Sequence, residues 1–350
     1  MGRAGARGDA RAVSGGRDPV RVGLLGAGAV AQIVHLPIFT ERGDVDVLAI
    51  ADPDGLKAES LASRFGVPRV LDDDALLGDG DVEAVVICAP NNRHESLAVA
   101  ALEAGKHVLV ERPLALTAEG AQRVLDAARA ADRCLAVGMN HRYRPDAGAL
   151  RAFISGGELG TITAVRASSL TRAQPVVRRT WRQKPEEAGG GAFMDLGVQI
   201  VDLAFWLLDY PEVERVVAVL TGERNGIEDG ATVLATSRDG IAFSFEVSWS
   251  LFAEADRHYA RVMGTEGSGT LPPLQVHKQL GGRPVDVTPR QPTPRGGENS
   301  FTNAYRRLLD EFVRSVAGEC SLPLPEEQVA LMAFVEAVYR SAREGGEVRL

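Results

Sequence analysis

Cysteine and histidine are scarce in this chain of 350 residues. Its six histidines show no metal-ligand spacing, so we expect no metal site. The cysteines also lack motif spacing, which excludes a disulfide framework and predicts reduced thiols in a cytoplasmic protein. The three cysteines are Cys88, Cys134 and Cys320.

A basic stripe and a long apolar run are also missing. The formal net charge is -8, which argues against nucleic acid and anionic membranes as partners. We identify no apolar stretch long enough to span a bilayer, so no membrane partner is expected. Residues 1–19 are rich in Gly, Ala and Arg but lack the apolar region of a secretory signal. We predict a disordered tail there, with an organellar targeting peptide as the alternative.

Near its N-terminus the chain has an apolar run that stops at a glycine-rich turn. Residues 20–31 read V-R-V-G-L-L-G-A-G-A-V-A and place Gly26, Gly28 and Ala31 at G-x-G-x-x-A spacing. The pattern then becomes helical. Strand, tight turn and helix start in this order are typical of a unit that holds a dinucleotide pyrophosphate at the helix N-terminus. An ordinary glycine turn in an α/β domain is the alternative interpretation.

A second apolar strand at residues 45–51 ends in an acidic residue, Asp52. It follows the turn by about 20 residues, the distance at which a carboxylate meets the adenosine ribose hydroxyls. Pro53 and Asp54 come next, and no Arg or Lys stands beside Asp52 before Lys57. Because a carboxylate repels a 2′-phosphate, we expect NAD to be preferred over NADP.

Strands and helices alternate through the rest of the N-terminal part. We predict strands at residues 69–71, 82–88, 107–110 and 135–138. A helix over residues 53–64 would bury Leu56, Leu61 and Ala62, and another would follow at residues 94–104. Thr117 would cap a further helix. This alternation predicts a doubly wound parallel sheet whose strand ends share one crevice, lined by Asp52, Asn91, Glu111 and Asn140.

The pattern changes after Asn140. A helix at residues 147–154 and a strand at 161–169 precede an Arg-rich loop, and an apolar helix over 192–208 follows three glycines. Residues 241–251 alternate, with large apolar side chains such as Phe243 on one face and small or polar ones such as Ser244 on the other. Two helices at residues 301–316 and 326–343 close the chain. The arginines of this predicted loop are Arg172, Arg178, Arg179 and Arg182.

These patterns predict an α/β protein with two domains. Residues 20–140 would form a Rossmann domain with a doubly wound parallel sheet. Residues 141–350 would form an α+β domain with a mostly antiparallel open sheet, one face of which lacks helices.

Five motifs, in this order, carry a resemblance to a known family. They are G-A-G-A-V-A at residues 26–31, A-P-N-N-R-H at 89–94, A-G-K-H-V-L-V-E-R-P at 104–113, W-R at 181–182 and G-G-G-A-F-M-D-L-G-V-Q at 189–199. Together they resemble the glucose–fructose oxidoreductase and inositol dehydrogenase family, called Gfo/Idh/MocA, over residues 20–350. The resemblance implies an NAD(P)-dependent enzyme acting on sugars, cyclitols or related polyols. It also implies substrate and oligomer contacts through the open sheet, in a homodimer or homotetramer.

The resemblance and the crevice together give a set of expected site residues. The expected cofactor contacts are Gly26, Gly28, Ala29, Val30, Asp52, Ala89, Pro90, Asn91, His94, Glu111, Arg112 and Asn140, with His94 fixing the loop at Asn91. The expected substrate contacts are Arg172, Trp181 and Arg182, and the expected catalytic residues are Arg112, Asp195 and Gln199.

The sequence departs from the family pattern where its chemistry lies. Arg112 stands where the family has the lysine of E-K-P, and Gln199 stands where it has the histidine of D-x-x-x-H, whereas Asp195 is kept. Arginine stays protonated and glutamine does not titrate, so neither can take a hydroxyl proton. Arg112 could still stabilise an oxyanion. Because the chain has only four lysines, a general bias toward arginine is an alternative explanation for Arg112, but not for Gln199.

Several neighbouring side chains have two interpretations. Asp195 could act as a base or only cap its helix, and Trp181 could stack on a sugar ring or anchor its loop. Tyr143 and His141 could supply a proton or make surface contacts. His258 could face the pocket or be buried at its rim.

Three functions follow from these residues. The first is an NAD(P)-dependent oxidoreductase of a sugar-like hydroxyl or carbonyl with altered acid–base groups. The second is a redox-neutral lyase- or epimerase-type enzyme that retains NAD. The third is a non-catalytic nucleotide-binding regulatory protein.

Overall fold

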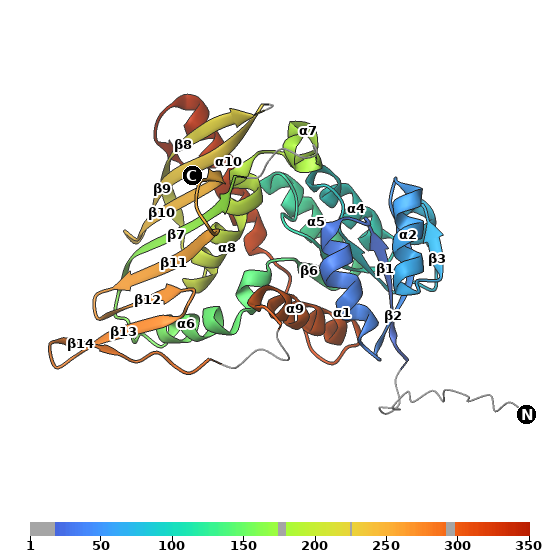
Figure 1. The fold of residues 1–350 in the computed structure, drawn as a ribbon, viewed down its shortest axis with the longest axis horizontal. Coiled ribbons are helices and arrows are strands. Elements are labelled where there is room, and N and C mark those ends of the chain that lie inside the picture. The colour runs from blue at the N-terminus through green and yellow to red at the C-terminus, as the bar shows by residue number, and fades with distance from the viewer. Residues whose placement is uncertain (1–17, 174–179, 225, 292–297) are drawn as a thin grey trace, which may run out of the picture.

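A computed structural model of the chain describes residues 18–173, 180–224, 226–291 and 298–350 (Figure 1). All but the last two residues of the predicted tail lie outside these ranges, as do Arg178 and Arg179 of the predicted loop. Two β-sheets dominate the described molecule, and helices lie between them and on the outer side of the first sheet.

The first sheet has six parallel strands in the order β3-β2-β1-β4-β5-β6, which confirms the predicted doubly wound Rossmann sheet. Its strands are β1 (Val20–Leu25), β2 (Val45–Ala51), β3 (Arg69–Leu71), β4 (Ala84–Ile87), β5 (His107–Val110) and β6 (Leu135–Val137). Every residue of β4 is buried, because helices cover both faces of a parallel sheet.

The helices of this part follow the predicted order. They are η1 (Ala31–His35, one π-helical turn), α1 (Leu36–Thr40), α2 (Gly55–Phe65), α3 (Asp73–Gly78), α4 (Asn91–Glu103) and α5 (Ala118–Ala131). Thr117 caps α5, as predicted, by accepting a hydrogen bond from the Gly120 N–H. The prediction for Leu56 was wrong: this residue is 79% exposed, because the helical repeat places it on the face of α2 opposite the buried Leu61 and Ala62.

The second sheet has nine strands in the order β14-β13-β12-β11-β7-β10-β9-β8-β15. Only the β7–β10 pair is parallel among its described strands, so the predicted mostly antiparallel sheet is confirmed. The strands are β7 (Ile162–Arg172), β8 (Val213–Arg224), β9 (Ile227–Ser237), β10 (Ala242–Leu251), β11 (Arg257–Gly264), β12 (Gly267–Leu271), β13 (Gln275–Leu280), β14 (Arg283–Asp286) and β15 (Val348–Arg349). Along β10, Phe243, Phe245 and Val247 are buried while Ala242 and Glu246 are exposed, as the alternation predicted.

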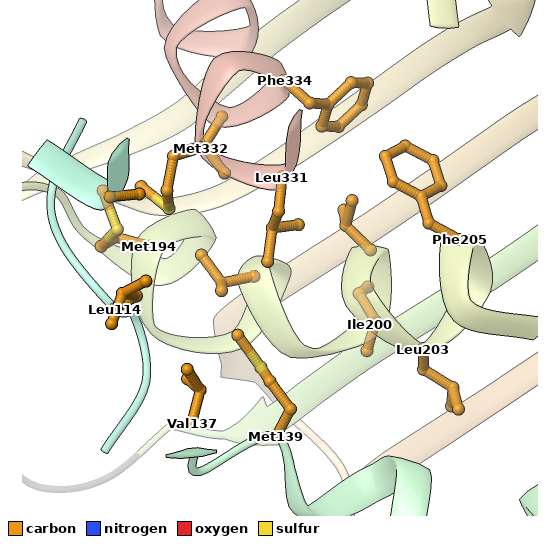
Figure 2. Packing of buried hydrophobic residues seen from close by; sticks show 14 of the residues in the cluster. Leu114, Val137, Met139, Met194, Ile200, Leu203, Phe205, Leu331, Met332 and Phe334 are labelled. Atoms are coloured by element: carbon orange, nitrogen blue, oxygen red, sulfur yellow. The ribbon is translucent and has the colours of Figure 1, made fainter. Parts of the chain in front are cut away.

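Helices cover one face of this second sheet and leave the other open (Figure 1). The remaining helices are η2 (Asn140–Tyr143), α6 (Pro145–Ser155), η3 (Trp181–Gln183), α7 (Pro185–Ala188), η4 (Phe193–Gly197, a π-helical turn), α8 (Val198–Leu207), α9 (Ser300–Val316) and α10 (Glu327–Glu344). Figure 2 shows side chains of α8 and α10 meeting Leu114, Val137 and Met139 from the first sheet's side, so one apolar core joins the two sheets.

The segment that contains η4 and α8 corrects one expectation. Pro185–Leu207 is long and apolar enough, by length and composition alone, to cross a membrane. However, 72% of its most apolar window is buried inside the protein, where α8 packs against both the second sheet and α10. The apolar composition of this segment therefore reflects a central core helix.

Helix α9 packs against the first sheet although it follows the second sheet in the chain. Tyr305, Leu308 and Phe312 of α9 belong to a buried cluster with Leu24 and Val86 of β1 and β4. The C-terminal part of the chain therefore completes the core of the parallel sheet.

The aromatic contacts of α8 lead to a stability prediction. Phe205 is 2% exposed and lies edge-to-face against Phe243, Phe245 and Phe334. Because the rigid sheet cannot close the resulting void, we expect Phe205→Ala to lower the free energy of unfolding by about 3–5 kcal/mol. Leu56→Ala, at an exposed site, should change it by less than about 0.5 kcal/mol. Urea denaturation followed by circular dichroism measures both, and equal effects would contradict the packing described here.

Candidate active site

A cavity of about 230 Å³ lies where the carboxyl ends of the parallel strands face the second sheet. It is bordered by the glycine turn, the ends of β4 and β5, the segment around η3, and the η4–α8 helix. Among the predicted site residues, those that line it are Gly28, Ala29, Val30, Ala89, Asn91, His94, Glu111, Arg112, Trp181, Arg182, Asp195 and Gln199. Both π-helical turns, η1 and η4, contribute to its wall, and such turns are frequent at functional sites.

The glycine turn is held in a conformation that favours glycine. Gly26 has φ of +102°, and a Cβ atom there would lie 2.7 Å from the carbonyl carbon of Cys88. The Asp52 carboxylate anchors the turn by accepting a hydrogen bond from the Ala27 N–H at 2.7 Å. Lys57 Nζ lies 3.1 Å from the same carboxylate oxygen, so Asp52 has a cationic neighbour that its position in the sequence did not indicate. Neither Gly26 nor Asp52 lines the cavity itself.

The loop after β4 is fixed by buried side chains. The two ring nitrogens of His94 lie 2.7 Å from the Pro113 carbonyl oxygen and 2.9 Å from the Ala89 carbonyl oxygen, so this ring bridges the ends of β4 and β5. Burial lowers the pKa of His94. The Asn91 side chain donates a hydrogen bond to the Ala188 carbonyl at 2.9 Å, which ties this loop to α7. Burial also raises the pKa of the Cys88 thiol, as expected for an inert cysteine.

A buried carboxylate, Glu111, lies beside Arg112. Its two oxygens meet His35 Nε2 at 2.7 Å and the hydroxyl of Tyr305 at 3.0 Å. Burial by itself raises the pKa of Glu111, but the contacts with His35, Arg112 and Tyr305 outweigh burial and lower it overall. Glu111 is therefore a fixed anion in the wall of the cavity. No local pattern in the sequence indicates His35 or Tyr305, which come from η1 and α9.

Asp195 is the point at which the two halves of the site meet. Its carboxylate lies 3.6 Å from Arg112 Nη2, 3.3 Å from Arg182 Nε and 3.2 Å from the indole nitrogen of Trp249. The guanidinium of Arg182 also stacks over the Trp181 ring, 4.4 Å from its centroid. Trp181 thus holds Arg182 against Asp195, and Trp249 on β10 is a contact that sequence reasoning missed.

Asn140, Arg172 and Pro90 do not line the cavity, whereas Gln199 does. Gln199 Nε2 is 3.4 Å from the side-chain oxygen of Asn140, a fully buried residue. Arg172 lies at the end of β7, where it pairs with Asp256 at 3.4 Å. The last of this group, Pro90, precedes α4.

Two candidate proton donors, His141 and Tyr143, are placed by the structure in low-dielectric surroundings. Burial lowers the pKa of His141 to about 3, with the positive charges of Arg144 and Arg112 adding to the effect, so its imidazole is neutral at pH 7. Burial raises the pKa of Tyr143, whose hydroxyl interacts with Glu311 instead of the cavity. By exposure both residues are half-buried, and His141 Nδ1 has no hydrogen-bond partner among the described residues.

The fold and this cavity define a dinucleotide-dependent oxidoreductase. A model of the oxidoreductase family with an NAD-binding Rossmann fold matches residues 20–139, and a model of that family's C-terminal α/β domain matches residues 151–350. The chain belongs to the Gfo/Idh/MocA oxidoreductase family.

Named relatives share nearly the whole chain. The D-glucoside 3-dehydrogenase of Escherichia coli (strain K12) is 29% identical and covers 95% of this chain and 98% of its own length. The inositol 2-dehydrogenase of Acidothermus cellulolyticus is 31% identical and covers 93% of each. A crystal structure of GenD2 from gentamicin A biosynthesis, in complex with NAD, superposes with a TM-score of 0.83 at 28% identity, covering 98% of this chain and 99% of that one.

These findings identify the protein as an NAD-binding oxidoreductase that acts on CH–OH or C=O groups. The glycine turn fits the cofactor, since a side chain at Gly26 would collide with Cys88 and the turn leads directly into the helix η1.

Proposed function

We propose that the protein is an NAD-dependent dehydrogenase or reductase of a sugar or cyclitol in which Arg112 and Gln199 replace the usual lysine and histidine. The observation that carries this proposal is the single cavity that joins Gly28 of the glycine turn to Arg112, Asp195 and Gln199. The names of the dehydrogenase relatives support the substrate class.

The proposed cofactor contacts form two groups, one at the glycine turn and one at the ends of β4 and β5. Gly26, Gly28, Ala29 and Val30 would hold the pyrophosphate with backbone N–H groups, and Asp52 would meet the adenosine ribose. The loop at Ala89, Pro90 and Asn91, fixed by His94, would border the ring end together with Glu111, Arg112 and Asn140. NAD supplies the acceptor for the hydride when it is bound.

Asp195 is suited to receive the substrate hydroxyl. An ionised carboxylate has about four lone-pair sites. Arg182 and Trp249 each use one of them, and Arg112 approaches the same oxygen as Arg182. The other oxygen therefore keeps a position for a hydroxyl hydrogen, which Asp195 would orient and accept.

Arg112 would then stabilise charge on the reacting oxygen. Its guanidinium stays protonated, so it can lower the energy of an alkoxide but cannot remove a proton. Gln199 would orient a second hydroxyl through its amide, which Asn140 holds in place. We propose Trp181, Arg182 and Arg172 as the substrate-facing group at the cavity mouth.

The open face of the second sheet is our proposed oligomer contact, giving a homodimer or homotetramer in the cytoplasm. The strand register places Val217 of β8 opposite Leu234 of β9, and Leu234 opposite Ser244 of β10. On this face Val219 is 59% exposed and Leu234 is 57% exposed. A flat apolar patch of this kind is suited to a symmetric contact with a second copy. All three cysteines are free, which agrees with a reducing compartment.

The cofactor preference gives the first prediction from this proposal. The wild-type protein should bind NAD at least about tenfold more tightly than NADP, because Asp52 repels a 2′-phosphate. Asp52→Ser should reduce the preference, since it removes the repulsion and frees Lys57 to meet the phosphate. Lys57→Met should increase the preference. Calorimetric titration measures these affinities, and equal or tighter binding of NADP by the wild type would contradict the role of Asp52.

The proposed function is tested on a panel of sugars and cyclitols. With NAD present, the wild type should produce reduced cofactor from at least one member. A protein purified with NAD that shows no net reduction would favour the redox-neutral alternative, and one that binds NAD without any turnover would favour a regulatory protein.

The double variant Arg112→Lys with Gln199→His tests whether these residues stand in for a proton relay. On simple polyols we expect a gain of about 10²–10⁴-fold in kcat/KM, the usual contribution of general acid–base catalysis. The gain should be non-additive, and the pH profile should acquire a limb near neutrality from the new histidine. The native activity should fall. An unchanged rate on every polyol, with NAD still bound, would contradict the proposed replacement.

The oligomer contact is tested by charge. Val219→Glu with Leu234→Glu should convert the assembly to a monomer, because two carboxylates would be buried without partners. Val70→Glu, at an exposed position on β3, is the matched control and should leave the mass unchanged. Light scattering at micromolar concentration gives the masses, and a monomeric wild type would overturn the proposal.

A further inference from the structure

The helix that carries Asp195 begins at a side-chain clamp made by Glu228 and Tyr339. One oxygen of Glu228 accepts a hydrogen bond from the Gly191 N–H, and the other accepts one from the Phe193 N–H, both at 2.9 Å. The hydroxyl of Tyr339 donates to the second oxygen, also at 2.9 Å. The first N–H groups of a helix have no partner within it, and Glu228 satisfies two of them here.

The clamp explains why glycine occupies residues 190 and 191. A Cβ atom at Gly191 would lie 2.8 Å from Cδ of Glu228, and one at Gly190 would lie 2.8 Å from Cζ of Tyr339. The two glycines therefore let the carboxylate and the phenol approach the backbone directly. Glu228 and Tyr339 come from β9 and α10, two elements far from this loop in the sequence.

Hydrogen bonds, more than packing, hold Glu228 in this position. Its side chain is buried, at 8% exposure for the residue, yet it borders a second cavity of about 410 Å³ together with Gly190 and Tyr339. A side chain next to open space can rotate when its hydrogen bonds are lost. Its negative charge at a helix N-terminus is also favoured by the helix dipole.

The clamp is one helical turn from the reacting end of the site. The Asp195 N–H donates to the Gly191 carbonyl at 3.0 Å, so Gly191, whose N–H is held by Glu228, also anchors Asp195 through its carbonyl. A shift of this first turn would move the Asp195 carboxylate relative to Arg112 and Trp249.

We propose that Glu228 is a positioning residue for the reaction and acts through Asp195, with Tyr339 orienting the Glu228 carboxylate. This inference rests on the proposed function, in which Asp195 meets the substrate hydroxyl. It assigns Glu228 no contact with substrate or cofactor.

Glu228→Gln is the decisive variant. Glutamine has the same length but only one accepting atom, so its amide group must face one of the two backbone N–H groups. We expect kcat/KM for the substrate found on the panel to fall by about 10–100-fold, as small displacements of a reacting group do, while the affinity for NAD stays unchanged. Tyr339→Phe keeps both backbone hydrogen bonds and should cause a smaller loss in the same direction.

A readout that needs no substrate separates this inference from the proposed function. The chain has three tryptophans, so the indole N–H signals in an NMR spectrum of labelled protein can be assigned by substitution. The Trp249 signal reports its hydrogen bond to Asp195, and Asp195→Asn defines its position when that carboxylate is lost. Glu228→Gln should shift the Trp249 signal toward that position and speed amide exchange at Gly191 and Phe193.

The outcomes are distinct. A folded Glu228→Gln protein with wild-type kcat/KM and an unmoved Trp249 signal would overturn the inference. Equal losses of NAD affinity and kcat/KM would also overturn it, because they indicate general destabilisation. If no sugar is turned over but the Trp249 signal moves, the proposed function fails and the positioning of Asp195 stands. If Glu228→Gln does not fold, Tyr339→Phe decides by the same signal.

Discussion

The burial of one helix determines where the reacting groups lie. The η4–α8 helix is apolar on almost every side and packs against both the second sheet and α10, so it cannot rotate or slide without opening the core. Asp202 on the same helix pairs with Arg142 of η2, and Arg142 also contacts Glu327 of α10 at 2.7 Å. Packing of this helix and the ion pairs of Arg142 therefore fix the positions of Asp195 and Gln199. The wall of the cavity that these two residues form is as rigid as the core.

The charges in the cavity are balanced within a small volume. Arg112 and Arg182 converge on Asp195, while Glu111 is held by His35 and Tyr305. An arginine in such a network is a fixed positive charge, whereas a lysine at the same place could lose its proton when desolvated. In the proposed reaction, Arg112 would therefore contribute orientation and charge stabilisation, and Asp195 would be the proton acceptor.

The strands of the first sheet could be predicted closely because the central ones are largely buried and read as apolar runs, although the edge strand β3 is partly exposed. The predicted bounds of β2, β3 and β5 match the structure, while β4 is shorter than the apolar run because hydrophobic residues continue past the ladder. Leu56 was misplaced because it is apolar but stands five and six residues before Leu61 and Ala62, a spacing that puts it on the opposite face of the helix.

The candidate site was predictable only where local motifs mark it. The glycine turn, Arg112 and Asp195 carry such motifs, and the cavity brings them together except for Gly26. His35, Tyr305, Trp249 and Glu228 come from four separate elements and act through contacts across the fold. A single sequence contains no local pattern for such contacts, so only the three-dimensional arrangement shows them.

The position of α9 determines when the first sheet can complete its core during synthesis of the chain. The parallel sheet leaves the ribosome first, but part of its apolar face, including Leu24 and Val86, is covered by Leu308 and Phe312, which are synthesised after the second sheet. A nascent chain therefore exposes this face until α9 has emerged, and the N-terminal sheet completes its core only after the strands of the second sheet before α9 have been synthesised. Nascent chains of this protein are for that reason expected clients of ribosome-associated chaperones that shield exposed hydrophobic surface.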